Sequence, residues 1–119
     1  MDATKYKWID IEEDNPIPHL TRRKLQGEKM LVAQVTMAKG CHVASHHHES
    51  EQIAVMLSGS TIWTIGAEGS LDRKTIPMID GDIMVIPSNV WHSVDVLEDT
   101  VVVDILSPIG PMGVDSQKS

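Results

Sequence analysis

The sequence predicts an all-β protein, a double-stranded β-helix or jelly-roll barrel, and three observations lead to that class. Short runs rich in Ile, Val and Thr recur along the chain, and turn pairs such as Ser-Gly, Asp-Gly and Glu-Asp separate them. No segment shows the apolar spacing of an amphipathic helix. Eight such runs at short intervals are typical of an antiparallel sandwich or barrel. The 119 residues are enough for one hydrophobic core.

The order of the elements follows from where the turn residues fall. We expect an extended arm over residues 1–19, where charged side chains are mixed with Pro16 and Pro18. We expect the barrel over residues 20–108 and a flexible C-terminal tail over residues 109–119, which hold two Gly, one Pro and a polar end. The expected strands are HLTRRKL (19–25), MLVAQVTMA (30–38), EQIAVML (51–57), STIWTIG (60–66), KTIPMI (74–79), DIMVIP (82–87), WHSVDVL (91–97) and TVVVDILS (100–107).

Net charge and cysteine content restrict the class of partner. The formal net charge is −7, which disfavours binding to nucleic acid or to an anionic membrane surface. Cys41 is the only cysteine, which excludes an internal disulfide framework and a thiolate-only zinc knuckle. No apolar stretch approaches the roughly 20 residues of a spanning helix, and we recognise no secretory signal. We therefore expect a cytoplasmic protein with a small-molecule partner.

Four of the six histidines lie within residues 42–48, just ahead of a run that is typical of a buried strand. In a strand, alternate side chains share a face, so His46 and His48 point one way and His47 points the other. Gln52 keeps the parity of the first two, and His92 lies on a later strand. Three imidazoles and an amide oxygen suit a mononuclear site for a divalent metal. The alternative is a solvated histidine cluster with His92 in the core.

Asp104 is a carboxylate inside an otherwise apolar run. If the metal ligands are three imidazoles and an amide, they carry no charge, and a divalent ion keeps its full positive charge. Such an ion favours Lewis-acid chemistry without redox change. That chemistry also needs a residue that carries a proton. Burial would raise the pKa of Asp104 and a nearby metal would lower it, so the residue is a candidate for that role. The alternative is an outward-facing Asp, or one paired with a lysine.

The spacing of these residues resembles the two motifs of the cupin superfamily over about residues 28–107. The first motif, G-x5-H-x-H-x3-E-x6-G, is matched by Gly40, His46, His48, Gln52 and Gly59. The second, G-x5-P-x-G-x2-H-x3-N, is matched by Gly81, Pro87 and His92, with Asn89 and Val96 as departures. Asn89 still suits a turn with positive φ. Gln52 stands where the motif has Glu, so it is either the fourth ligand or only a hydrogen-bonding neighbour of a three-ligand metal.

The stretches HHHESEQIAVMLSG, GDIMVIPSNVWHSV and LEDTVVVDILSP are similar to those of short cupins that linearise unsaturated monouronates. This resemblance implies a homodimer, a metal set of His46, His48, Gln52 and His92, and a catalytic Asp104. The chain lacks that family's Arg beyond the Ser-Pro, and a uronate carboxylate prefers a guanidinium partner. Arg23 is our candidate replacement, because it shares parity with Thr21 and Leu25; the alternative is a solvated basic edge strand.

The function we expect is that of a metal-dependent isomerase, lyase or ring-opening enzyme. It would act on a small oxygen-rich, anionic metabolite such as an unsaturated sugar acid, with one divalent transition metal ion per chain (Zn, Ni, Fe or Mn). Two alternatives remain open: a nonhaem iron dioxygenase and a noncatalytic metabolite-binding cupin.

Overall fold

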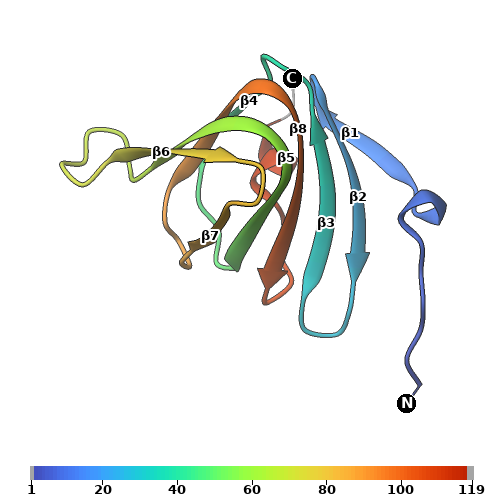
Figure 1. The fold of residues 1–119 in the computed structure, drawn as a ribbon. Helices are drawn as coiled ribbons and strands as arrows, with labels where there is room; N and C mark the ends of the chain where they lie inside the picture. The colour runs from blue at the N-terminus through green and yellow to red at the C-terminus, as the bar shows by residue number, and fades with distance from the viewer. Residues whose placement is uncertain (1, 118–119) are drawn as a thin grey trace.

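The computed structural model describes residues 2–117, which form eight antiparallel strands and two short 3-10 helices (Figure 1). The elements are η1 (Trp8–Asp10), β1 (Glu13–Ile17), β2 (Leu20–Gln26), β3 (Leu31–Met37), β4 (His42–His46), β5 (Glu51–Ile65), β6 (Lys74–Ile79), β7 (Ile83–Ile86), β8 (His92–Ser107) and η2 (Gly113–Ser116). The predicted all-β jelly-roll class is confirmed. Within residues 2–117, no helix has the length and apolar character needed to cross a membrane.

Two long, curved strands organise the barrel. The strand order is β1-β2-β3-β8-β5-β6, with β4 also paired to β8 and β7 also paired to β5. The first half of β8 pairs with β4 and with the second half of β5. The second half of β8 pairs with β3 and with the first half of β5. The two strands therefore run side by side through the centre of Figure 1 and connect the parts of the wall.

Four of the expected strands merge into these two, which corrects the sequence prediction. The Ser-Gly and Glu-Asp pairs are typical of turns, but here they lie within continuous strands. The register between β5 and β8 shifts several times from Met56 to Thr61, so the chain bends without leaving the sheet. Gly59 makes the bend possible, because its φ is +117° and an added Cβ would lie 2.6 Å from Thr100 Cα.

Two strands were not expected, and they lie on polar segments. β1 falls inside the arm predicted over residues 1–19 and pairs with β2 through a turn at His19, whose φ is +68°. β4 contains two of the histidines and pairs with the start of β8. Before β1 the chain runs away from the barrel (Figure 1). Met1, which belongs to the predicted arm, lies outside the described residues.

The C-terminal segment folds back onto the barrel, where the sequence predicted a flexible tail over residues 109–119. Met112 and Val114 are buried in the core cluster, and η2 follows directly. Gln117 exchanges hydrogen bonds with the backbone of Ala44 in β4, at 2.7 and 3.0 Å. Residues 118–119 of the predicted tail lie outside the described residues.

Alternating side chains of β2, β3, β5 and β8 fill the barrel, as strand periodicity requires. The core consists of aliphatic and Met side chains with Cys41 and Trp63, and it contains no Phe, because the sequence has none. Polar side chains are also buried, and those that define the candidate site are Arg22, Gln52, His92 and Asp104.

Candidate metal centre and active site

Three histidines from two separate segments converge at one end of the barrel. His46 ends β4 and lies opposite His92 at the start of β8, and their ring centroids are 4.2 Å apart. His48 follows in the loop, with its ring 5.0 Å from that of His92. One nitrogen of each ring lies within 4.8 Å of the others, so the three can hold a metal ion. His47 turns away to the ring of Trp91, at 4.3 Å, as the predicted alternation requires.

The backbone fixes the tautomer of all three rings. Each Nδ1 lies 2.8 Å from a carbonyl oxygen two residues away, in the pairs His46–Ala44, His48–Ser50 and His92–Val90. A carbonyl oxygen can only accept, so each Nδ1 carries the hydrogen and each Nε2 presents a lone pair. His92 Nε2 is buried and has no hydrogen-bond partner among the described residues. A buried acceptor without a partner is costly, and a cation between the three rings would satisfy it.

Gln52 adds a fourth acceptor to this group. It is the second residue of β5, is 5% exposed, and donates from Nε2 to Asp104 Oδ1 at 2.9 Å. That bond sets the amide orientation and directs Oε1 to within 3.1 Å of His48 Nε2. Because the backbone bond leaves His48 Nε2 unprotonated, two acceptors face each other at this distance. A positive ion between the two would remove the conflict.

Asp104 points into the barrel, which decides between the two orientations left open by its sequence. It lies on β8 between Ala33 of β3 and Ala54 of β5, whose small side chains leave room around the carboxyl group. The side chain is 6% exposed. Burial raises the pKa of Asp104 to about 7, although the hydrogen bond from Gln52 opposes the shift. Without a metal, the acid and its conjugate base are therefore both accessible near neutral pH.

Burial keeps His46 and His92 neutral. Desolvation, followed by repulsion from His46, lowers the pKa of His92 to about 4. Desolvation also lowers the pKa of His46, against the effect of its backbone hydrogen bond. Trp63 stacks beside His92 with an interplanar angle of 20° and holds the ring in place. Neutral imidazoles are the form that binds metals, so the site is ready for a cation at neutral pH.

Arg23 does not point inward, which corrects the orientation predicted from its parity. It lies on the outer face of β2, where Nε donates to Ile11 O at 3.1 Å and NH2 lies 3.7 Å from Glu13. The prediction used Leu25 as a marker of the inner face. Leu25 instead lines a groove on the other side, together with Tyr6, Trp8 and Ile11.

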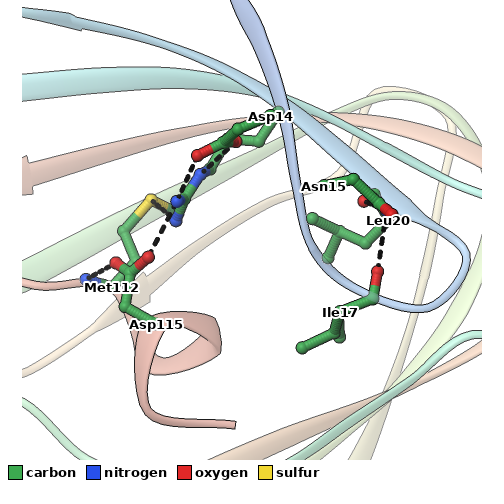
Figure 2. A network of polar contacts seen from close by, with 7 residues as sticks. Asp14, Asn15, Ile17, Leu20, Met112 and Asp115 are labelled. Carbon is green, nitrogen blue, oxygen red and sulfur yellow. Dashed lines mark hydrogen bonds and ion pairs between the residues drawn. The ribbon is translucent and has the colours of Figure 1, made fainter. Parts of the chain in front are cut away.

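Arg22 is the buried arginine, and the sequence analysis missed it. It shares the inner face of β2 with Leu20 and is 2% exposed. Asp14 and Asp115 bind its guanidinium group, and Met112 lies against it (Figure 2). One feature of the sequence could have identified Arg22 as the inward-facing arginine. Leu20, the first apolar residue after the turn, marks the face of β2 that points to the core, and Arg22 lies two residues later on the same face.

The C-terminal segment covers the metal end of the barrel. The cavity is lined by His46, Gln52, His92 and Asp104 and by Met112, Gly113 and Val114 of this segment. Gly113 packs so closely that an added Cβ would lie 2.1 Å from His46 Nε2. The cavity volume is about 40 Å³, a few times the roughly 10–15 Å³ that one water needs by this measure. An ion with one or two waters fits there, whereas a sugar acid does not.

Comparison with known proteins agrees with this architecture. A family model of the cupin domain matches residues 33–107. KdgF from a Halomonas species has a TM-score of 0.78 and 22% identity, over 90% of this chain and 96% of that chain. A tryptophan-to-phenylalanine variant of oxalate decarboxylase from Bacillus subtilis has a TM-score of 0.82 and 18% identity, over 94% of this chain and 31% of that chain. This chain thus spans about a third of the decarboxylase. No curated protein sequence matches the chain.

Proposed function

We propose that this chain, which belongs to the cupin family, is a metal-dependent enzyme. Its reaction would be redox-neutral, that of an isomerase or a lyase. The observation that carries the proposal is the hydrogen bond from Gln52 to Asp104. It joins a neutral group of donor atoms to a buried acid whose pKa burial raises to about 7. An electrophilic centre beside a proton carrier is the arrangement that isomerisation, ring opening and elimination require.

The metal ligands we propose are His46, His48, His92 and Gln52, which would hold one divalent transition ion per chain. Three nitrogen donors and one amide oxygen suit Zn, Ni, Fe or Mn. The fixed Nδ1–H bonds and the unpartnered Nε2 of His92 support this ligand set. The ion would supply Lewis-acid polarisation of a substrate carbonyl or hydroxyl oxygen.

Asp104 would carry the proton in this mechanism. Gln52 occupies Oδ1, which leaves Oδ2 to hold a proton or to accept one. The alanines on either side leave the carboxyl group open to the cavity instead of packing against it. A proton taken from one atom of the substrate and returned to another changes its bonding without any net transfer of electrons.

We propose an unsaturated sugar acid as the substrate. The support is the resemblance of three stretches, which carry the ligands and Asp104, to cupins that linearise unsaturated monouronates. The likeness to KdgF supports the fold, and the choice of substrate rests on those stretches. A cytoplasmic location is part of the proposal, supported by one buried free cysteine and a net charge of −7.

The experiment compares wild type with Asp104→Asn after loading with each candidate metal. We expect stoichiometric metal in both proteins, and loss of turnover of an unsaturated monouronate by about 10²-fold or more in the variant. Turnover would be followed by loss of the ultraviolet absorbance of the enol ether. Equal turnover in the two proteins would remove Asp104 as the proton carrier, and absence of bound metal from wild type would reject the proposal.

The dioxygenase alternative predicts a different readout. An amide ligand in place of a carboxylate stabilises a ferric state less, so the neutral donor set favours redox-neutral chemistry. Oxygen uptake by the iron-loaded protein, coupled to substrate loss, would favour the dioxygenase. A noncatalytic binding protein would bind the uronate and release it unchanged.

A further inference from the structure

Arg22 is a buried cation whose partners come from two different parts of the chain. Asp14 of β1 binds it through two oxygens, at 3.1 Å to Nε and 2.8 Å to NH2. Asp115 of η2 accepts a single bond from NH2 at 2.7 Å. Within residues 2–117, the acceptor for NH1 is the weakly accepting Met112 Sδ, at 3.6 Å. The side of the guanidinium that faces the C-terminal segment is therefore held by one carboxylate oxygen and a sulfur atom, from Asp115 and Met112 (labelled in Figure 2).

The same C-terminal segment closes the metal cavity. Met112, which contacts Arg22, also lines the cavity, and Gly113 packs on His46. Because the volume of the cavity that Asp104 lines is about 40 Å³, a sugar acid can lie beside Asp104 only after this segment moves. Its displacement would remove both Asp115 and Met112 from Arg22, and NH1 and NH2 would then face the vacated space.

Arg22 lies within reach of a ligand bound at the metal end. It pairs across the sheet with Val35, and Val35 pairs with Val102, two residues before Asp104. Two strand spacings separate Arg22 from β8, about 10 Å. Both Val35 and Val102 line the cavity. A six-carbon acid that holds one end near Asp104 can therefore direct its carboxylate toward the guanidinium.

We propose that Arg22 binds the carboxylate of the substrate, and that Asp115 is an internal carboxylate that takes its place when no substrate is bound. This inference rests on the proposed function, and it supplies the guanidinium that the position after the Ser-Pro lacks. The exchange of one carboxylate for another keeps the buried arginine paired throughout, which avoids the large cost of an unpaired buried charge. Two parallel bonds to NH1 and NH2 would replace one oxygen and one sulfur contact.

The test compares two aspartates that bind the same arginine. Asp115→Asn removes the internal carboxylate, whereas Asp14→Asn removes a charge of the same sign from the other side of the guanidinium. D-Galacturonate is the probe and D-galactose, which lacks the carboxylate, is its neutral counterpart. Affinities for both sugars are measured by calorimetry on the full chain, with and without Zn²⁺.

We expect Asp115→Asn to bind galacturonate about tenfold more tightly than wild type. The affinity of Asp14→Asn for galacturonate should change by less than about threefold. The affinity for galactose should be the same in both variants as in wild type. Adding Arg22→Lys to Asp115→Asn should cancel the gain, because lysine cannot form the bidentate pair. If the variant with Arg22→Lys does not fold, the comparison of Asp115→Asn with Asp14→Asn is sufficient to test the inference. Equal gains in both aspartate variants, an equal gain for galactose, or no galacturonate binding to Asp115→Asn would each overturn the inference.

Failure of the proposed function has a separate signature. A wild-type protein that binds no Zn²⁺, or that leaves an unsaturated monouronate unchanged, would reject the proposed metal enzyme. The galacturonate comparison in the absence of Zn²⁺ would still report on Arg22, since that contact needs no metal. Conversely, an active metal enzyme whose Asp115→Asn variant shows no gain would reject the role of Arg22 alone.

Discussion

Gln52 and Asp104 share a hydrogen bond of 2.9 Å between two buried side chains, with the amide as donor. A donor at position 52 requires the amide, because an ionised carboxylate there could only accept. The bond also directs the amide oxygen at the histidines. One residue thereby couples the candidate metal site to the candidate proton carrier.

Replacing Gln52 by Glu tests this coupling. The variant places two carboxyl groups in contact, so we expect them to share a proton and the pKa of Asp104 to rise above about 7. The added negative charge should retain or strengthen metal binding, while turnover falls by about tenfold or more. Metal content and the pH profile of turnover measure the two effects. Glu51→Gln, at the exposed neighbouring position, is the control, and equal turnover in Gln52→Glu and wild type would contradict the coupling.

Asp104 should make the metal-free protein less stable as the pH rises. Its pKa is 3.8 as a free group and about 7 in the fold, so the folded state binds the proton more tightly. The resulting stability is complete below about pH 4, and it is lost as the pH rises through about 7. The pKa difference corresponds to at most about 4 kcal/mol in the free energy of unfolding.

His92 acts in the opposite direction. Its pKa falls from 6.5 to about 4 on folding, so protonation opposes the fold, and stability decreases as the pH falls through that window. Urea denaturation of the metal-free wild type and Asp104→Asn at about pH 6 and about pH 8 isolates Asp104 through the difference between the two proteins, because His46 and His92 titrate in both. From about pH 6 to about pH 8, the stability of wild type should fall relative to that of Asp104→Asn. The same pH dependence in both proteins would contradict the assignment.

Gly113→Ala tests the close packing of the C-terminal segment on the histidines. The added Cβ would lie 2.1 Å from His46 Nε2, so either the segment or the imidazole must move. We expect a loss of about 1–3 kcal/mol in the free energy of unfolding, together with weaker Zn²⁺ binding. Gly27→Ala is the matched control, because its Cβ would meet nothing closer than 3.7 Å. Unchanged Zn²⁺ affinity in Gly113→Ala would show that the segment moves away freely.

Much of the candidate metal centre could be predicted from the sequence because a strand has a period of two. That period places His46 and His48 on one face, and the cupin spacing adds Gln52 and His92. The positive φ expected at Asn89 is also observed, at +63°. These features depend on local geometry, which adjacent residues determine.

The errors arose where local signals have two meanings. A Ser-Gly pair is typical of a turn and also of a bulge within a strand, and only the contacts with the partner strand distinguish the two. At Gly59 the close approach of Thr100 on β8 identifies a bulge. Parity on β2 is ambiguous because both faces carry apolar side chains, so Leu25 suggested the wrong face for Arg23. The closing segment has the Gly and Pro content of a flexible tail, yet Arg22 binds it from a strand about ninety residues earlier. Such long-range pairing leaves no local pattern.

Association of two copies stays a prediction, and the outer face of the sheet is the surface to test. Val85 of β7 pairs with Ile53 of β5, and Ile53 pairs with Ile105 of β8, so an apolar row crosses three strands. Ile83 and Val85 remain 65% and 57% exposed at the end of this face. An exposed apolar surface of this kind is typical of an interface between subunits.

Val85→Glu should therefore convert a homodimer into a monomer, because a buried carboxylate without a partner opposes association. Light scattering after size-exclusion chromatography measures the mass directly, and we expect twice the chain mass for wild type and one chain mass for the variant. Leu71→Glu introduces the same charge at a fully exposed position between β5 and β6, and it should leave the mass unchanged. A wild-type protein with the mass of one chain would contradict the predicted dimer, and a Val85→Glu protein that stays dimeric would place the interface on another surface.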